Sequence, residues 1–182
     1  MADVLSGGEI AKMVIDHHEA VYRYAYRLTG SVHDAEDLTQ EVFLIAQRKM
    51  GQLRKADGAK SWLFAVARNS FLRERQRQRP ASAADFDLDV NVLPDATPDD
   101  SVDGDRLQAV LNRLPEVFRV AVVMYYFEER SYKEIADELH VPIGTVMSRL
   151  ARAREHLRAM LLAAELKTPN QQPEKDAEKG PV

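Results

Sequence analysis

The sequence predicts an all-α protein with two small helical domains, the second of which contains a helix-turn-helix. Three observations predict this class. Apolar residues recur at helical spacing along most of the chain, and no convincing strand-like alternation is present. Proline and glycine end the helical segments. Residues 81–105 hold eight Asp and neither Lys nor Arg, so they have little apolar surface to bury, which predicts a flexible acidic linker.

These signals set the expected boundaries. The first domain is predicted over residues 9–80, with helices over about 9–28, 34–50 and 60–79. The linker is predicted over 81–104 and the second domain over 105–164, where Pro115 opens a strongly apolar helix. The polar tail, residues 165–182, is expected to be disordered.

Composition excludes several classes of protein. The 182 residues carry a net charge of −4, with 45% hydrophobic and 30% charged residues, as in ordinary soluble domains. The chain has no Cys, which excludes disulfides and thiolate metal sites. The five His lack metal-ligand spacing, and no phosphate loop or nucleophile motif is present, so we expect no catalytic residue, metal or cofactor and no enzyme. No signal peptide or membrane span is evident, so we expect a cytoplasmic protein without membrane contacts of its own.

The segment 131–158 is the most informative. Ser131 and Glu134 have the spacing of a capping box, in which each side chain satisfies a free amide at a helix start. An apolar stripe follows, and Pro142 then suits the first turn of a second helix. A connection this short sets two helices at a steep angle, which predicts a helix-turn-helix.

The second helix of this unit separates apolar from polar residues. One side is predicted to be buried and comprises Ile143, Val146, Met147, Leu150, Ala153 and Leu157. The other side gathers Thr145, Ser148, Arg149, Arg152 and His156. Arginine pairs bidentately with guanine, and Ser or Thr can bond bases or phosphates, so this face is a candidate for reading DNA in the major groove. The alternative is an ordinary amphipathic surface helix.

Two faces of the first domain also stand out. On the helix over 34–50, the inward residues are Ala35, Leu38, Val42, Ile45 and Ala46, and the outward ones are Asp37, Gln40, Glu41, Leu44 and Arg48. Leu44 is either an ordinary surface leucine or the anchor of a partner surface. On the helix over 60–79, one face combines cations with amides, namely Arg68, Asn69, Arg75, Gln76 and Arg79. Such a face is typical of nucleic-acid contact or of simple solvation, and Trp62 is expected in the core.

Three motifs carry a family resemblance. Residues 34–43, DAEDLTQEVF, resemble the helix of bacterial sigma factors that docks on the polymerase clamp. Residues 62–69, WLFAVARN, resemble the helix that opens and reads the downstream promoter element. Residues 131–154 resemble the helix-turn-helix that reads the upstream element. Their order and spacing over residues 10–163 resemble the extracytoplasmic-function (group IV, sigma-70 family) RNA polymerase sigma factors.

The resemblance implies roles for the faces already described. Contacts to core RNA polymerase are implied for Asp37, Gln40, Glu41 and Leu44. Contacts to a melted downstream element are implied for Arg68, Asn69, Arg73, Arg75 and Gln76, with a flipped base captured by the loop 51–60. Reading of the duplex upstream element is implied for Thr145, Ser148, Arg149 and Arg152. The acidic linker would enter the positively charged channel of the polymerase.

The resemblance also implies partners and one departure. Core RNA polymerase, promoter DNA and an anti-sigma factor are the implied partners. Because no extra C-terminal regulatory domain is evident, regulation is expected from that separate protein. Many relatives carry Asp where this chain has Arg73. The arginine at this position is expected to strengthen contact with the DNA backbone or to alter promoter preference.

Two rival functions and one structural question stay open. One rival is a self-sufficient helix-turn-helix repressor or activator, which would bind a palindrome as a dimer. The other is an interaction protein that sequesters a regulator without touching DNA. The relative placement of the two domains is also open, since they could pack together when inhibited and separate on polymerase.

Overall fold

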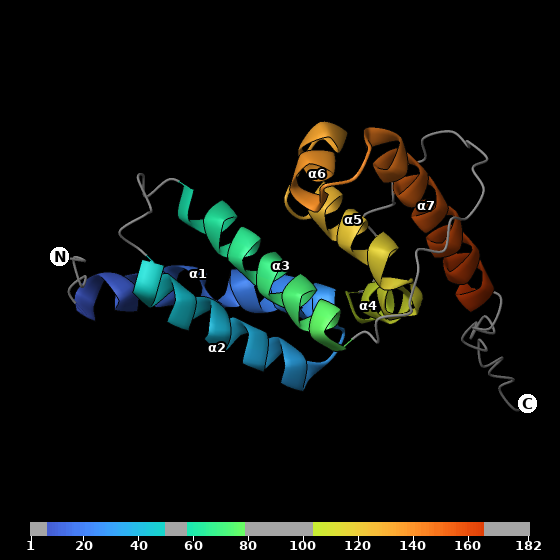
Figure 1. Ribbon diagram of the computed structural model, residues 1–182. Helices are drawn as coiled ribbons and strands as arrows, with labels where there is room; N and C mark the ends of the chain where they lie inside the picture. The colour runs from blue at the N-terminus through green and yellow to red at the C-terminus, as the bar shows by residue number, and fades with distance from the viewer. Residues whose placement is uncertain (1–6, 50–57, 79–103, 166–182) are drawn as a thin grey trace, which may run out of the picture.

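The computed structural model describes residues 7–49, 58–78 and 104–165, and within them it contains helices and no strand (Figure 1). The first domain holds α1 (Gly7–Thr29), α2 (Val32–Lys49) and α3 (Ala59–Gln78). The second holds α4 (Gly104–Arg113), α5 (Glu116–Tyr126), α6 (Tyr132–Leu139) and α7 (Ile143–Glu165). The all-α class is confirmed, and these helix ends lie within a few residues of the predicted ones. The predicted acidic linker and tail lie almost wholly outside the described residues.

The first domain is a three-helix bundle in which each helix packs on the other two. The predicted inward side of α2 is buried at Ala35, Leu38, Val42 and Ala46, while Ile45 is half-buried. Trp62 of α3 is half-buried against the core, as expected for a packing residue. The apolar stripe of α2 therefore fixes which of its sides faces outward.

The turn between α1 and α2 depends on Gly30. Its φ is +74°, a left-handed conformation that side chains with a Cβ rarely adopt. A Cβ built there would also lie within 2.1 Å of Asn112 Oδ1 on α4. The Asn112 amide in turn donates to the Gly30 carbonyl over 3.1 Å. Gly30 thus serves both the turn and the contact between the domains.

Gly30→Ala is therefore expected to lower the free energy of unfolding by about 1–2 kcal/mol, the usual penalty for a left-handed residue other than glycine. Urea unfolding followed by circular dichroism measures the change. Gly144→Ala is the matched control, because that glycine lies in the first turn of α7 with open space around it. Equal stability of the two variants would contradict the assigned role of Gly30.

The second domain is built around α5. This helix packs against α6 and α7 and also against α1 of the first domain. Burial on several sides explains its nearly continuous apolar sequence, with every residue from Phe118 to Met124 buried. Arg119 is among them, and burial lowers the pKa of its guanidinium.

The predicted helix-turn-helix is confirmed in α6 and α7. Ser131 caps α6 by accepting a bond from the amide of Glu134, and the Glu134 carboxylate accepts from the amide of Ser131, so the capping box is complete. The Ser131 hydroxyl also donates to that carboxylate and lowers the Glu134 pKa. His140 ends α6 with φ +54°, and Pro142 leads into α7. The left-handed residue produces the abrupt change of direction between the helices.

One part of the predicted α7 stripe is wrong. Val146, Leu150 and Ala153 are buried as predicted, but Ile143 is 49% and Met147 52% exposed. At about 100° per residue these two lie at the edge of the stripe rather than at its centre. The neighbouring helices cover the centre of the stripe and leave this edge open.

The two domains pack against each other. α1 contacts α4 and α5, and buried side chains of both domains form one continuous core cluster. Arg27 of α1 donates to the side chain of Gln108 on α4 over 2.9 Å, and Gln108 donates back to the Tyr26 carbonyl over 3.0 Å. The chain therefore adopts a closed arrangement, one of the two that the sequence left open. None of the described helices is long and apolar enough to cross a lipid bilayer.

Candidate nucleic-acid interface

The proposed upstream-reading residues lie along one side of α7, and all four are half-buried: Thr145, Ser148, Arg149 and Arg152. Ser148 donates its hydroxyl to the Thr145 carbonyl over 3.0 Å, one turn back along the helix. Nη2 of Arg152 is buried and has no hydrogen-bond partner among the described residues. This face is thus partly covered in the closed chain.

A groove at the junction of the domains lies beside this face. It encloses about 280 Å³. Gln76 lines it from α3 and Arg149 from α7, and the other lining residues are Leu72, Glu116, Val117, Val120 and Leu139. Residues assigned to two separate promoter elements therefore face the same groove in this arrangement.

The basic face of α3 is divided. Asn69, Arg73 and Gln76 are exposed, as expected for residues that contact a ligand. Arg73 turns back on its own helix, with Nε donating to the Asn69 carbonyl and Nη2 to the Ser70 hydroxyl, each over 3.2 Å. Arg75 is half-buried, lies over the Phe71 ring and reaches Glu116 of α5 at 3.6 Å. Arg79, the last cation of the predicted face, lies outside the described residues.

Arg68 is the main departure from the predicted face. The sequence places it on an open polar side, but it is only 1% exposed. It lies in line with the buried Phe64 and Phe71, so α3 has a second buried side. The expectation that Arg68 is accessible in the free chain is therefore wrong, whereas its role toward DNA stays a prediction.

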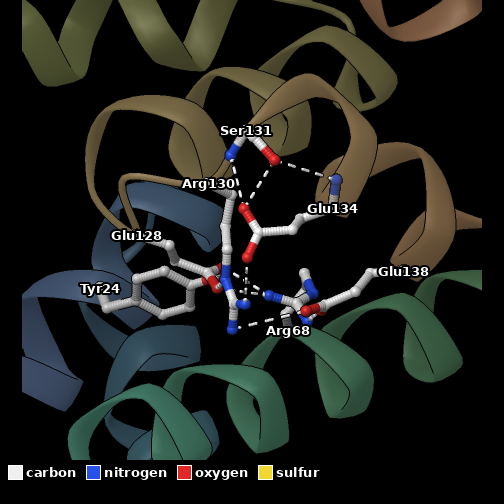
Figure 2. A network of polar contacts seen from close by, with 7 residues as sticks. All are labelled: Tyr24, Arg68, Glu128, Arg130, Ser131, Glu134 and Glu138. Carbon is white, nitrogen blue, oxygen red and sulfur yellow. Dashed lines mark hydrogen bonds and ion pairs between the residues drawn. The ribbon is translucent and has the colours of Figure 1, made fainter. Parts of the chain in front are cut away.

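A network of polar contacts surrounds Arg68 (Figure 2). Its Nη1 donates to both carboxylate oxygens of Glu128, at 2.5 and 2.7 Å, and its Nη2 pairs with Glu138 of α6. Tyr24 of α1 donates its hydroxyl to Glu128 over 2.5 Å. Burial, and then the Glu128 carboxylate, raises the Tyr24 pKa well above its usual range, so the phenol stays a proton donor.

Arg130 completes the network from the second domain. Its guanidinium lies 3.5 Å from Glu128, 3.4 Å from Glu138 and 3.4 Å from Glu134. The last contact joins the network to the capping box of α6. Two carboxylates thus lie between two guanidiniums, one from each domain, which compensates the charges of the buried Arg68 and Glu128.

Sequence reasoning missed Tyr24, Glu128, Arg130 and Glu138. One signal was available for Arg68 itself, because Phe64, Arg68 and Phe71 share a helical stripe with spacings of four and three residues. An arginine between two aromatic residues of such a stripe indicates a buried cation that needs an anionic partner. The partner itself could not be identified from this pattern.

The outer face of α2 lies where the sequence predicted it. Asp37, Gln40, Glu41 and Leu44 are all exposed, and Leu44 is 52% exposed. His33 Nδ1 lies 3.0 Å from the Asp37 carboxylate on this surface, and Glu41 accepts a bond from the Ser70 hydroxyl of α3 over 3.0 Å. A large apolar side chain is therefore presented among carboxylates. No cluster of three or more potential metal ligands exists among the described residues.

Two family models match the chain, and each covers one domain. The model of Sigma-70 region 2 matches residues 13–81, the bundle of α1 to α3. The model of Sigma-70 region 4 matches residues 104–157, from the start of α4 into α7. The two matches follow each other in the order of the motifs in the sequence.

The chain is also similar to individual sigma factors. The chain is 43% identical over 157 residues to the ECF RNA polymerase sigma factor SigE of Mycolicibacterium smegmatis, covering 82% of this chain and 60% of that protein. It is 33% identical to SigL of Mycobacterium tuberculosis, covering 84% and 89% of the two chains. A solved structure of the sigma factor RpoE with the anti-sigma factor NepR, from Bartonella quintana, has a TM-score of 0.60 and 28% identity over 85% of this chain and 97% of that one. The chain belongs to the extracytoplasmic-function sigma factors of the sigma-70 family, promoter-specific transcription-initiation factors that are not enzymes.

Proposed function

We propose that each domain of this sigma factor recognises its own promoter element, while α2 holds core RNA polymerase. The helix-turn-helix supports the first part of this proposal. A capped α6, a tight turn and a long α7 form the unit that places a second helix in the major groove of duplex DNA. Thr145, Ser148, Arg149 and Arg152 are the residues proposed to read the upstream element.

The basic face of α3 is proposed to hold the downstream element as a melted single strand. Asn69, Arg73 and Gln76 are exposed there and offer cationic and amide groups to phosphates and bases. Arg68 and Arg75 join them once the second domain moves away. The flipped base is assigned to the loop 51–60, most of which lies outside the described residues.

The outer face of α2 is proposed to bind core RNA polymerase. Leu44 supplies an apolar anchor, and Asp37, Gln40 and Glu41 surround it with polar groups, an arrangement that matches the apolar centre and polar rim of a protein interface. An anti-sigma factor is a further proposed partner, because the similar sigma factor RpoE was solved with one. Action on polymerase and promoter DNA places the protein in the cytoplasm.

The helix-turn-helix in α6 and α7, joined in one chain to a region-2 bundle, is the observation that carries this proposal. Transcription from fragmented genomic DNA with purified core RNA polymerase tests it. The chain is expected to start transcripts at a small set of positions that core enzyme alone does not use. Absence of such starts would refute the proposal, and tight binding to a palindrome without polymerase would favour a self-sufficient regulator.

Arg149→Ala is expected to weaken binding of the upstream element by about 1–3 kcal/mol, the range for one bidentate base contact. A gel shift with the promoter fragments found above measures the loss on the polymerase complex. Arg158→Ala is the matched control, because Arg158 is exposed on the same helix and outside the proposed face. Loss of polymerase binding as well would indicate misfolding, and equal affinity of the two variants would remove Arg149 from the reading face.

A further inference from the structure

Arg68 is held by the second domain rather than by its own. The two carboxylates that pair with it, Glu128 and Glu138, come from the segment after α5 and from α6. The Glu128 side chain is only 2% exposed, so this pairing lies inside the contact between the domains. We name Arg68, Glu128, Arg130 and Glu138 the charge clasp.

A second contact repeats this pattern further along α3. Arg75 of α3 pairs with Glu116 of α5 at 3.6 Å, and Gln76 lines the groove between the domains. Two of the five α3 residues assigned to DNA, Arg68 and Arg75, are thus paired with the second domain, and the exposed Gln76 lines the groove beside it. In both ion pairs, a carboxylate is paired with a guanidinium that the proposed DNA role assigns to a phosphate.

We propose that the charge clasp keeps the free sigma factor closed and masks its downstream DNA-binding face, with Glu128, Glu138 and Glu116 as internal stand-ins for phosphate. This inference rests on the DNA role proposed for α3. A buried guanidinium whose two terminal nitrogens are paired with carboxylates cannot also bind a strand. The apparent DNA affinity is therefore the intrinsic affinity of the open state multiplied by the fraction of chains that are open.

The chemistry of the clasp suits a reversible switch. Buried ion pairs contribute little net stability, because desolvation of the charges offsets much of their attraction, but they penalise a state in which one partner is removed. Separation of the domains returns both charges to water, and DNA then supplies new anions to the cations of α3. Binding of polymerase and promoter can thus favour the open state through differential affinity.

Spin labels test the clasp directly. Because the natural chain has no Cys, Glu19→Cys on α1 and Lys133→Cys on α6 give one label in each domain. The clasp is weakened by Glu128→Gln with Glu138→Gln, which keeps the shape of each side chain and removes its charge. Glu129→Gln is the matched control, since this exposed neighbour makes none of the clasp contacts described above. The single variant Glu138→Gln replaces the double variant in this test if the double variant loses helix content. The Glu138 side chain is 29% exposed, so its change disturbs the core less.

We expect longer inter-label distances in the clasp variants, and at least roughly ten-fold tighter binding of a fluorescein-labelled single-stranded DNA of mixed sequence at low salt. The control should match the natural chain in both measurements. Unchanged distances in folded clasp variants would overturn the inference. Longer distances without tighter binding would overturn the DNA role proposed for α3, and the masking with it, although the clasp would then still be what closes the chain.

Discussion

Arg68→Met is expected to weaken the docking of the two domains by about 3 kcal/mol, the lower end of the cost of removing one partner from a buried ion pair. The variant leaves the Glu128 carboxylate in a site where only 2% of its side chain is exposed. Arg130 remains at 3.5 Å, which keeps the expected loss from being larger. The inter-label distance and the urea unfolding midpoint together measure the effect.

A double variant separates lost charge from lost packing. Arg68→Met with Glu128→Met replaces the ion pair in which both side chains are only 2% exposed by apolar groups of similar length, a change that is often neutral or stabilising in a buried site. The inter-label distance of this double variant should return most of the way to that of the natural chain. Continued opening to the extent of the single variant would show that Arg68 acts through its shape rather than through its pairing.

Leu44→Asp is expected to weaken binding to core RNA polymerase by about 2–4 kcal/mol, the range of the few interface residues that dominate binding. The leucine is the large apolar group on the outer face of α2, and an aspartate there would have to be desolvated on docking. Fluorescence anisotropy of the labelled chain with core enzyme measures the affinity.

Ile15→Asp is the matched control for this face. Ile15 is 80% exposed on α1 and is not part of the proposed polymerase surface. Its replacement should leave the affinity within about 0.5 kcal/mol, as for ordinary surface positions. Equal losses in the two variants, or no loss in Leu44→Asp, would remove the outer face of α2 from the interface.

Local signals were enough to predict most of the fold. The capping box of Ser131 and Glu134 fixed the start of α6, because both partners lie within one turn of sequence. The apolar stripe of α2 placed Leu44 and its neighbours outward for the same reason, since periodicity within one helix decides which side it buries. The candidate polymerase face therefore lies where the sequence predicted it.

Contacts between distant segments could not be predicted in this way. Arg68 and Glu128 are 60 residues apart, and no pattern within either segment specifies the other. The exposure of Ile143 and Met147 has the same origin, because helical spacing gives the direction of a side chain but not the extent of the neighbouring helices. The errors thus fall on residues whose surroundings are set by the packing of separate helices.

The closed arrangement bears on both faces that are proposed to read DNA. Each is polar and basic, as the sequence predicted, yet in the free chain both turn partly toward the junction of the domains. Arg68 is buried there, and Gln76 and Arg149 line one groove. On the roles proposed for the two faces, binding of both promoter elements is expected to require separation of the domains.

The distance between the two domains, measured on the same spin-labelled chain with and without core RNA polymerase, tests this account most directly. Alone, the chain with labels at Glu19→Cys and Lys133→Cys should show one short, narrow distribution, because α1 and α6 belong to domains that share one core. With core enzyme and promoter DNA, the distribution should move to longer distances as Arg68 leaves Glu128. An unchanged short distance in the transcribing complex would contradict the account.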